Sequence, residues 1–151
     1  MVEIKRILHP SDFSEFSDIA LDYAALLARQ CDAELHLLHV LTDPMSVVQG
    51  PTDYTLPDGF FAELCKQAEA ALAERPGNKS GIKITRVTSI GQAPGEIIHY
   101  AKDKHMDLIV MGTHGLTGLA HLLIGSVAER VTRLAPCPVM TVPAPGRAVG
   151  S

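Results

Sequence analysis

The feature that most constrains the fold of this chain is the alternation of short apolar runs with stretches of helical periodicity. Five runs have the length and apolar character of strands: 4–8, 33–40, 82–87, 108–111 and 137–142. Apolar residues at helical spacing follow the first four, over 16–27, 60–74, 95–105 and 126–134. This alternation predicts a single α/β domain in which helices cover both faces of a parallel sheet.

The character of each run predicts its place in the sheet. Residues 82–87 alternate apolar and polar side chains, and residues 137–142 contain Pro138, so both strands are expected at edges. The other three runs are more continuously apolar and are expected at the centre. Right-handed crossovers then give a doubly wound, five-stranded parallel sheet in the order 3-2-1-4-5. Ligands of open α/β sheets bind where this order reverses, between the first and fourth strands.

Chemically suggestive residues follow both of these strands. Pro10, Ser11 and Asp12 come after the first, and a segment from Gly112 to Ser126 with four glycines comes after the fourth. Glycine lets backbone N–H groups approach a phosphate, and a helix N-terminus adds unpaired donors and a positive dipole end. The sequence therefore predicts a phosphate site at the reversal.

Helix capping is the competing explanation for two of these residues. Asp12 and Glu15, like Ser126 and Glu129, have the spacing of a capping box. For Asp12, a cap and a ligand contact explain the residue equally well, and its place at the reversal favours the ligand. Ser126 can cap its helix and still leave other N–H groups free for a ligand.

The glycine segment resembles a known signature. Gly112, Gly115, Gly125 and Ser126 fit G-x2-G-x9-G-[ST], which is similar to the nucleotide-binding signature of the universal stress protein family. The Pro-Ser-Asp-Phe-Ser after the first strand and the Cys-Pro-Val of the last extend the resemblance over nearly the whole chain. It implies a nucleotide-binding domain over 1–143. The remaining residues 144–151 are expected to be a flexible tail because they end the chain. The resemblance also implies that ATP, or another adenine nucleotide, is bound, often by a dimer.

The resemblance assigns roles to individual residues. Asp12 is expected at the ribose or adenine, and the backbone of Val40 at the adenine edge. Met111 and Gly112 are expected against the sugar and phosphates. The phosphates are expected to be cradled by Gly115, Gly125, Ser126 and Val127. With Pro10 shaping the turn and His114 within the glycine loop, the candidate set is Pro10, Asp12, Val40, Met111, Gly112, His114, Gly115, Gly125, Ser126 and Val127.

The glycine segment has the residues to hold a nucleotide but lacks those that cleave one. It contains no Lys or Arg and no Walker pattern, whereas phosphoryl transfer needs cations aimed at the transferring group. Any Mg²⁺ or Mn²⁺ would be bound through the phosphate oxygens. We therefore expect a nucleotide-dependent stress-response or signalling protein with at most weak ATP hydrolysis. A slow ATPase and a nucleotide-free interaction module of the same fold remain alternatives.

Composition argues against several other classes. The net charge of −4 and the lack of any basic run disfavour a nucleic-acid partner, and no apolar stretch is long enough to span a bilayer. Three cysteines without a C-x-x-C motif are typical of reduced thiols in the cytoplasm. His36 and His39, three apart on a strand, are expected on opposite faces, so they cannot chelate one metal ion.

The last strand is expected to carry an interface. Residues 137–142 leave one edge of the sheet unpaired, and two such edges can pair about a two-fold axis. We therefore expect a homodimer through Cys137–Val142, although Pro138 could instead block edge pairing. Cys137 itself is expected to be an unreactive thiol. The partner protein is not identified by the sequence, and the long irregular stretch 41–58 has the length of a functional or mobile loop.

Overall fold

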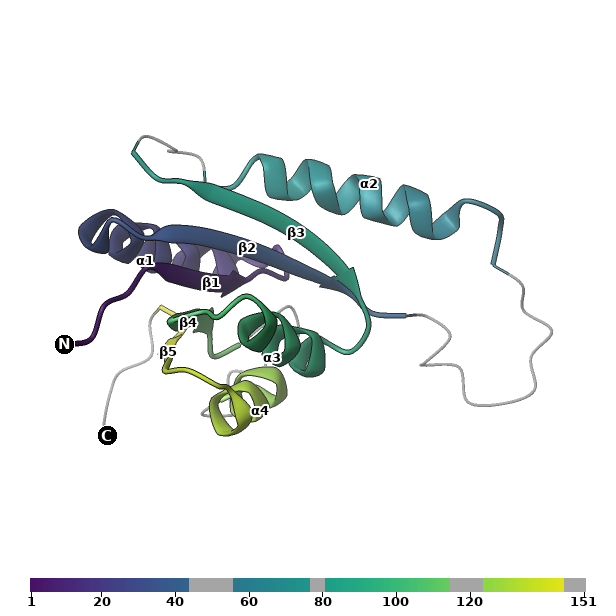
Figure 1. The fold of residues 1–151 in the computed structure, drawn as a ribbon. Helices are drawn as coiled ribbons and strands as arrows, with labels where there is room; N and C mark the ends of the chain where they lie inside the picture. Colours follow the sequence, from purple (N-terminus) through teal and green to yellow (C-terminus); the bar gives the residue numbers. More distant parts are fainter. Residues whose placement is uncertain (44–55, 77–80, 115–123, 146–151) are drawn as a thin grey trace.

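Five parallel strands form the sheet in the described part of the chain, which in this computed structural model comprises residues 1–43, 56–76, 81–114 and 124–145. The strands are β1 (Arg6–Pro10), β2 (Glu34–Leu41), β3 (Ile84–Ile90), β4 (Leu108–Gly112) and β5 (Val139–Val142). Their order across the sheet is β3-β2-β1-β4-β5 (Figure 1). The predicted doubly wound fold and its strand order are therefore confirmed.

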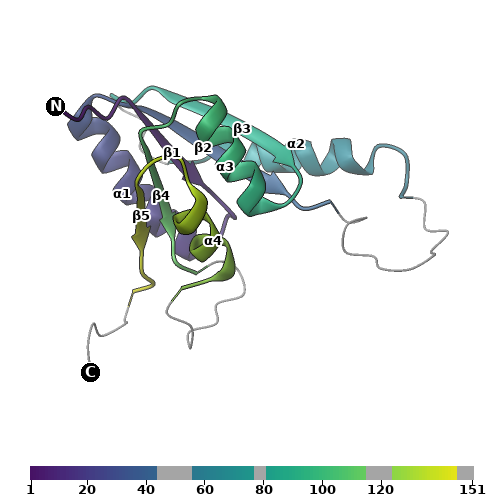
Figure 2. The same ribbon diagram turned by 60° about the horizontal axis from the view of Figure 1, so that its bottom comes forward.

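Helices cover both faces of this sheet. Within the described residues they are α1 (Glu15–Cys31), α2 (Phe60–Ala73), α3 (Ala93–Asp103) and α4 (Ser126–Leu134). On one face α1 lies over β1, β2 and β4, and α2 lies over β2 and β3. On the other face α3 and α4 pack against each other (Figures 1 and 2). Because the crossovers are right-handed, α1 follows β1 on one face and α4 follows β4 on the other, and the strand order reverses between β1 and β4.

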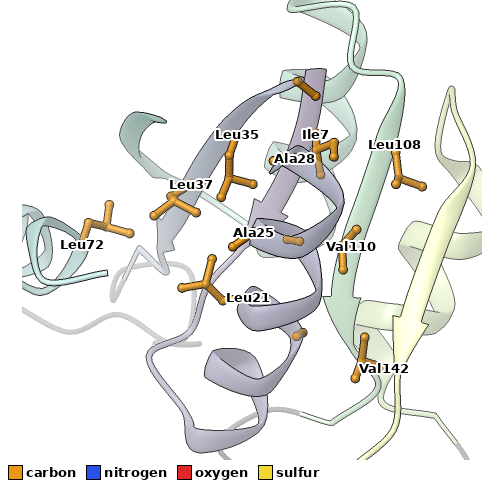
Figure 3. Packing of buried hydrophobic residues seen from close by; sticks show 13 residues of the cluster. Ile7, Leu21, Ala25, Ala28, Leu35, Leu37, Leu72, Leu108, Val110 and Val142 are labelled. Carbon is orange, nitrogen blue, oxygen red and sulfur yellow. The ribbon is translucent and has the colours of Figure 1, made fainter. Parts of the chain in front are cut away.

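The core has two layers because successive residues of the central strands point to opposite faces. Ile7 faces α1, Leu8 faces α3 and α4, and neither side chain is exposed to solvent. Figure 3 shows the layer beneath α1, to which Leu21 of α1, Leu37 of β2 and Val110 of β4 all contribute. Burying each such side chain contributes about 1.5–3 kcal/mol, which is why the central strands are continuously apolar.

Most elements begin or end at residues other than those predicted, and three of these differences illustrate why. β1 continues to Pro10, because a proline at the last position of a strand removes only one ladder donor. α3 begins at Ala93, two residues before the predicted start, since Pro94 in its first turn lacks an N–H that would have no helical partner. β3 continues to Ile90 because its pairing with β2 reaches that residue.

Two predicted segments fall largely outside the described residues. Of the irregular stretch 41–58, residues 44–55 are not described, and of the tail 144–151 only 144 and 145 are. No helix in the ranges that the structure describes is long and apolar enough to cross a membrane.

Candidate functional site

The two central strands part at their carboxyl ends. Pairing between β1 and β4 covers only Ile7 with Leu108 and Leu8 with Ile109, although β1 stays paired with β2 to its end and β4 with β5. A cavity of about 420 Å³ lies where they separate. This volume falls within the range of small-molecule sites, and the position is the one predicted for a ligand of this fold.

His9 spans the gap between the separating strands. Its Nδ1 lies 2.9 Å from the carbonyl oxygen of Val110 on β4, beyond the last backbone pair between the two strands. A carbonyl only accepts, so Nδ1–H donates, and in the neutral imidazole Nε2 is then the acceptor. Burial lowers the pKa of His9 to about 4, which keeps this neutral form at physiological pH. The histidine was not singled out from the sequence, although a histidine within a buried apolar run is a usable signal.

A short polar path leads from His9 to the cavity wall. Ser17 Oγ lies 3.4 Å from His9 Nε2 and 3.4 Å from Ser11 Oγ. Both serines are buried, and both line the cavity. The cavity therefore has a hydroxyl-bearing wall that is fixed to the core through a neutral imidazole.

The structure brings nine of the ten candidate residues to this cavity. Its lining includes Pro10, Asp12, Val40, Met111, Gly112, His114, Gly125, Ser126 and Val127. The tenth, Gly115, lies outside the described residues. Segments about 100 residues apart in sequence thus meet at one place, as the position of the order reversal predicts.

The lining also contains residues that the sequence did not assign to a site. They are Ser11, Ser17, Leu38, Thr42, Ala93, Ile97, Thr113 and Ala128. Ser11 and Thr113 are adjacent in sequence to assigned residues, which would have been enough to find them. Ala93 and Ile97 come from α3, whose apolar residues the sequence explains equally well as core. Only the packing of α3 beside α4 shows that they border the cavity.

At the β1–α1 junction, side chains occupy the start of the helix. Ser14 is the N-cap of α1, and its Oγ accepts from the backbone N–H of Ser17 at 3.1 Å. Asp12 Oδ1 accepts from the N–H of Ser14 at 2.9 Å. The predicted capping box of Asp12 and Glu15 is therefore wrong, because Asp12 lies two residues before the cap. Asp12 instead stabilises the turn that leads into α1 and lines the cavity.

At the β4–α4 junction, the cap residue has no side chain that could bond to the helix. Gly125 is the N-cap, and it makes no side-chain cap bond. The predicted capping box of Ser126 and Glu129 is therefore wrong, since Ser126 is the first helical residue and lies inside the cap position. The first turn of α4 faces the cavity with Ser126, Val127 and Ala128. Backbone donors and the positive end of the helix dipole are thus directed at the site.

Gly125 is also required by close packing within this junction. Its N–H donates to the carbonyl oxygen of Thr113 at 2.6 Å, and a Cβ on Gly125 would lie 2.8 Å from that same oxygen. That separation is shorter than real Cβ contacts, so any side chain at position 125 would force the two backbone segments apart. Glycine thus holds the end of β4 against the start of α4.

The cavity carries one acidic group and no basic side chain among the residues described. Among the described lining residues Asp12 is the only carboxylate, and there is neither Lys nor Arg. His114 is buried and places Nδ1 2.9 Å from Thr113 Oγ1. The lining therefore suits a ligand with hydroxyl or amino donors at one end and an anion near α4, but it lacks the cations of a phosphoryl-transfer site.

His36, His39 and Cys137 have structural environments. His36 contacts Tyr100 of α3, whereas His39 contacts the Ser11 carbonyl, so the prediction that they face opposite sides of the sheet is confirmed. Across the described ranges, no group of three or more His, Cys, Asp and Glu is placed to hold a metal ion. Burial raises the pKa of the Cys137 thiol, which disfavours the reactive thiolate.

Comparison with known proteins gives consistent results over the whole chain. The sequence model of the universal stress protein family matches residues 3–143. The universal stress protein MJ0531 of Methanocaldococcus jannaschii is 38% identical over 144 residues, covering 93% of this chain and 83% of that protein. The solved structure of MJ0577, from the same organism, is 30% identical with a TM-score of 0.81, covering 97% of this chain and all of that one.

Two more distant solved structures share the fold and carry a ligand. One is a universal stress protein in complex with cAMP, 23% identical, with a TM-score of 0.60 over 93% of this chain and 98% of that one. The other is the universal stress protein of Archaeoglobus fulgidus in complex with dAMP, 20% identical, with a TM-score of 0.61 and the same coverage. At these identities the likeness concerns the fold.

Proposed function

Because the chain belongs to the universal stress protein family, we propose that its cavity binds an adenine nucleotide, and ATP in particular. The observation that carries the proposal is the pairing, in one cavity, of the Asp12 carboxylate with the glycine-capped N-terminus of α4. A nucleotide has complementary parts, with hydroxyl and amino donors on its sugar and base and negative charge on its phosphates. Two proteins of this fold carry the adenine nucleotides cAMP and dAMP, which supports the same ligand class here.

The phosphates would bind at the β4–α4 junction. Backbone N–H groups of Ser126 and Val127 lie in the first turn of α4, where anions are favoured by both the unpaired donors and the helix dipole. Gly112 and Gly125 keep this junction compact, and Gly115 completes the proposed cradle from outside the described residues. A Mg²⁺ or Mn²⁺ ion would be held mainly by the phosphate oxygens, because the described cavity lining supplies only one carboxylate.

The nucleoside would bind between β1, β2 and α3. Asp12 accepts from the ribose or adenine, and the backbone of Val40 meets the adenine edge. Leu38, Ile97 and Met111 give this part of the cavity an apolar wall suited to a flat aromatic base.

Holding rather than hydrolysing the nucleotide is the role that this lining supports. Hydrolysis needs a cation at the γ-phosphate and a group that orients water, and the described lining has no Lys or Arg. The bound nucleotide would then act as a signal that changes the association of this protein with a protein partner in the cytoplasm. Weak ATPase activity is the upper limit of the proposal.

A homodimer through β5 is the second part of the proposal. β5 is an edge strand, and its inner side is paired with β4 from Val139 to Val142. No strand of the described residues pairs with its outer side, where the same strand of a second copy would produce a two-fold interface continuous with both sheets.

The nucleotide proposal is tested first on the purified full-length chain. One sample is denatured, and the released small molecules are separated by ion exchange with mass detection. A second, folded sample freed of bound nucleotide is titrated with ATP by calorimetry. We expect ATP with little ADP, and loss of affinity in Asp12→Asn but not in the matched control Asp22→Asn, which is exposed on α1. Mostly ADP would favour a slow ATPase. No released nucleotide and no binding of added ATP would favour the nucleotide-free interaction module.

The dimer is tested by truncation and sedimentation velocity. Ending the chain after Pro136 removes β5 and should leave a monomer, whereas ending it after Pro145 keeps β5 and should leave a dimer. Circular dichroism checks that the shorter chain is folded. A folded dimer after the Pro136 truncation would assign the interface elsewhere.

A further inference from the structure

The residue after Asp12 is held in an unusual backbone conformation by two side chains from distant elements. Phe13 has a φ of 64°, in the left-handed region that bulky residues rarely adopt. Its ring stacks on the imidazole of His39 with a centroid distance of 4.1 Å and an interplanar angle of 24°. The guanidinium carbon of Arg75 lies 5.0 Å from the centre of the same ring. We refer to Phe13, His39 and Arg75 as the aromatic clamp.

Both outer members of the clamp are themselves tethered to the β1–α1 junction. His39 Nδ1 lies 2.7 Å from the carbonyl oxygen of Ser11, the residue before Asp12. Arg75 binds the carboxylate of Asp18 on α1 through two nitrogens, at 2.7 Å from Nε and 3.3 Å from Nη2. Asp12 thus lies between Ser11, whose carbonyl oxygen contacts His39 of the clamp, and Phe13, which belongs to the clamp. The two flanking contacts restrict the direction in which its side chain leaves the backbone.

Arg75 is held in position by Arg86 of the edge strand β3. Arg86 on β3 donates to the carbonyl oxygens of Leu72 at 2.8 Å and of Arg75 at 2.6 Å, at the C-terminal end of α2. The Arg75 guanidinium also donates to Ala71 in the last turn of α2, at 3.0 Å. These bonds hold the end of α2 and the backbone of Arg75 in place, and from there the Arg75 side chain reaches the Phe13 ring.

The clamp lies outside the cavity. Leu38 and Val40 of β2 line the cavity, whereas His39 between them points to the face covered by α1 and α2. None of the three clamp residues belongs to the cavity lining. Any effect of the clamp on a ligand must therefore pass through the residues it positions, of which Asp12 is the one with a charge in the cavity.

We propose that the aromatic clamp is a positioning device that directs the Asp12 carboxylate toward the sugar or base of a bound nucleotide. The inference rests on the proposed adenine-nucleotide function. It adds Arg75, just beyond the end of α2, and His39, on the face of β2 opposite the cavity. It makes the end of α2 part of the machinery that sets nucleotide affinity, although α2 contributes no residue to the described cavity lining.

A double-mutant cycle on the full-length chain tests the inference. ATP affinity is measured by calorimetry for the wild type, Arg75→Met, Asp12→Asn and the double variant. Methionine keeps much of the apolar stem of Arg75 and removes its charge. Asparagine keeps an oxygen to accept from the Ser14 N–H. We expect Arg75→Met to raise the Kd about fivefold in the wild type and less than twofold in the Asp12→Asn background. The matched control Arg29→Met, exposed in the last turn of α1, should leave the Kd unchanged.

Several outcomes decide between positioning and a merely structural role. An equal Kd for the wild type and Arg75→Met, or the same fold-change in both backgrounds, overturns the inference while leaving the nucleotide proposal intact. A wild type that binds no adenine nucleotide overturns both. If Arg75→Met does not fold, Arg75→Lys keeps the charge but loses the planar double bond to Asp18, and a smaller but still Asp12-dependent rise in Kd is expected.

A ligand-free measurement supplies an independent readout. The Ser14 amide is bonded to Asp12 Oδ1, so its hydrogen exchange reports whether the carboxylate is held in place. We expect faster exchange of this amide in Arg75→Met and no change in Arg29→Met. Equal exchange in all three proteins would overturn the inference.

Discussion

The two strand-to-helix junctions that border the cavity are built in opposite ways. At the β1–α1 junction, side chains satisfy the start of the helix, with Ser14 as cap and Asp12 bonded to the Ser14 amide. At the β4–α4 junction, a glycine is the cap, so the cap residue contributes no side-chain bond to the helix. At the first junction, backbone N–H groups bond to side chains of the junction itself, and a carboxylate lines the cavity. At the second junction, the first turn of α4 and its positive dipole end face the cavity. Together they match the two ends of a nucleotide.

The largest predicted effect concerns His9, which holds the two junctions at a fixed separation. Its folded pKa of about 4 lies below the usual 6.5, so the unfolded chain binds a proton more readily and stability falls as the pH drops through this window. Between pH 7 and pH 4 this group should cost about 3 kcal/mol. Urea unfolding at both pH values measures the loss. His9→Asn keeps a donor for Val110 and cannot titrate, so its stability should decline less.

The comparison between wild type and His9→Asn removes the contribution of the carboxylates, which titrate in both proteins. Parallel declines from pH 7 to pH 4 would mean that His9 is not kept neutral by burial.

The next largest effect is expected at the cap of α4. Gly125→Ala places a Cβ 2.8 Å from the Thr113 carbonyl oxygen and should cost about 2 kcal/mol of unfolding free energy, with weaker ATP binding. The matched control is Gly95→Ala in α3, where a Cβ meets nothing within 4 Å. Alanine there should stabilise the protein by roughly 0.5–1 kcal/mol, because glycine is a poor helix former. Equal effects at the two glycines would contradict the close approach at position 125.

These junctions also show what the sequence can and cannot predict. Strand order and the meeting of Asp12 with Gly125 follow from apolar patterning and the right-handed crossover rule, because both act on whole elements. Cap positions do not follow, since a capping box needs a particular backbone conformation that several nearby residues can provide equally well. The sequence offered Asp12 and Ser126 as caps, and the caps are Ser14 and Gly125.

Contacts between side chains that are distant in sequence could not be predicted from the sequence either. Phe13, His39 and Arg75 meet because α2 ends beside the β1–α1 junction, and no periodicity in any one segment encodes that meeting. Ala93 and Ile97 likewise reach the cavity only through the packing of α3 on α4. Local patterns specify which face of an element is buried, whereas the neighbours on that face depend on the assembled layers.

A smaller effect is expected at the cap of α1. Ser14→Ala removes the oxygen that accepts from the Ser17 amide at 3.1 Å, and Ser17 is buried. Losing an N-cap of this kind costs about 1 kcal/mol. Thermal or urea unfolding measures the loss, and hydrogen exchange should show faster opening of the first turn of α1 than of its later turns. A variant as stable as the wild type would mean that Asp12, and not Ser14, is the effective cap.

The smallest effect is expected for Ser126→Ala, and it is the sharpest contrast with Ser14→Ala. Ser126 is the first residue inside α4, so its hydroxyl is not in the cap position and its removal should change the unfolding free energy by less than about 0.5 kcal/mol. The backbone N–H remains, so ATP affinity should fall by no more than the loss of one hydroxyl contact, about fivefold. Urea unfolding and calorimetry on the same preparation give both values. A loss of stability equal to that of Ser14→Ala would show that Ser126 caps α4 after all. The two junctions would then be built alike, and the donors of α4 would no longer be reserved for a ligand.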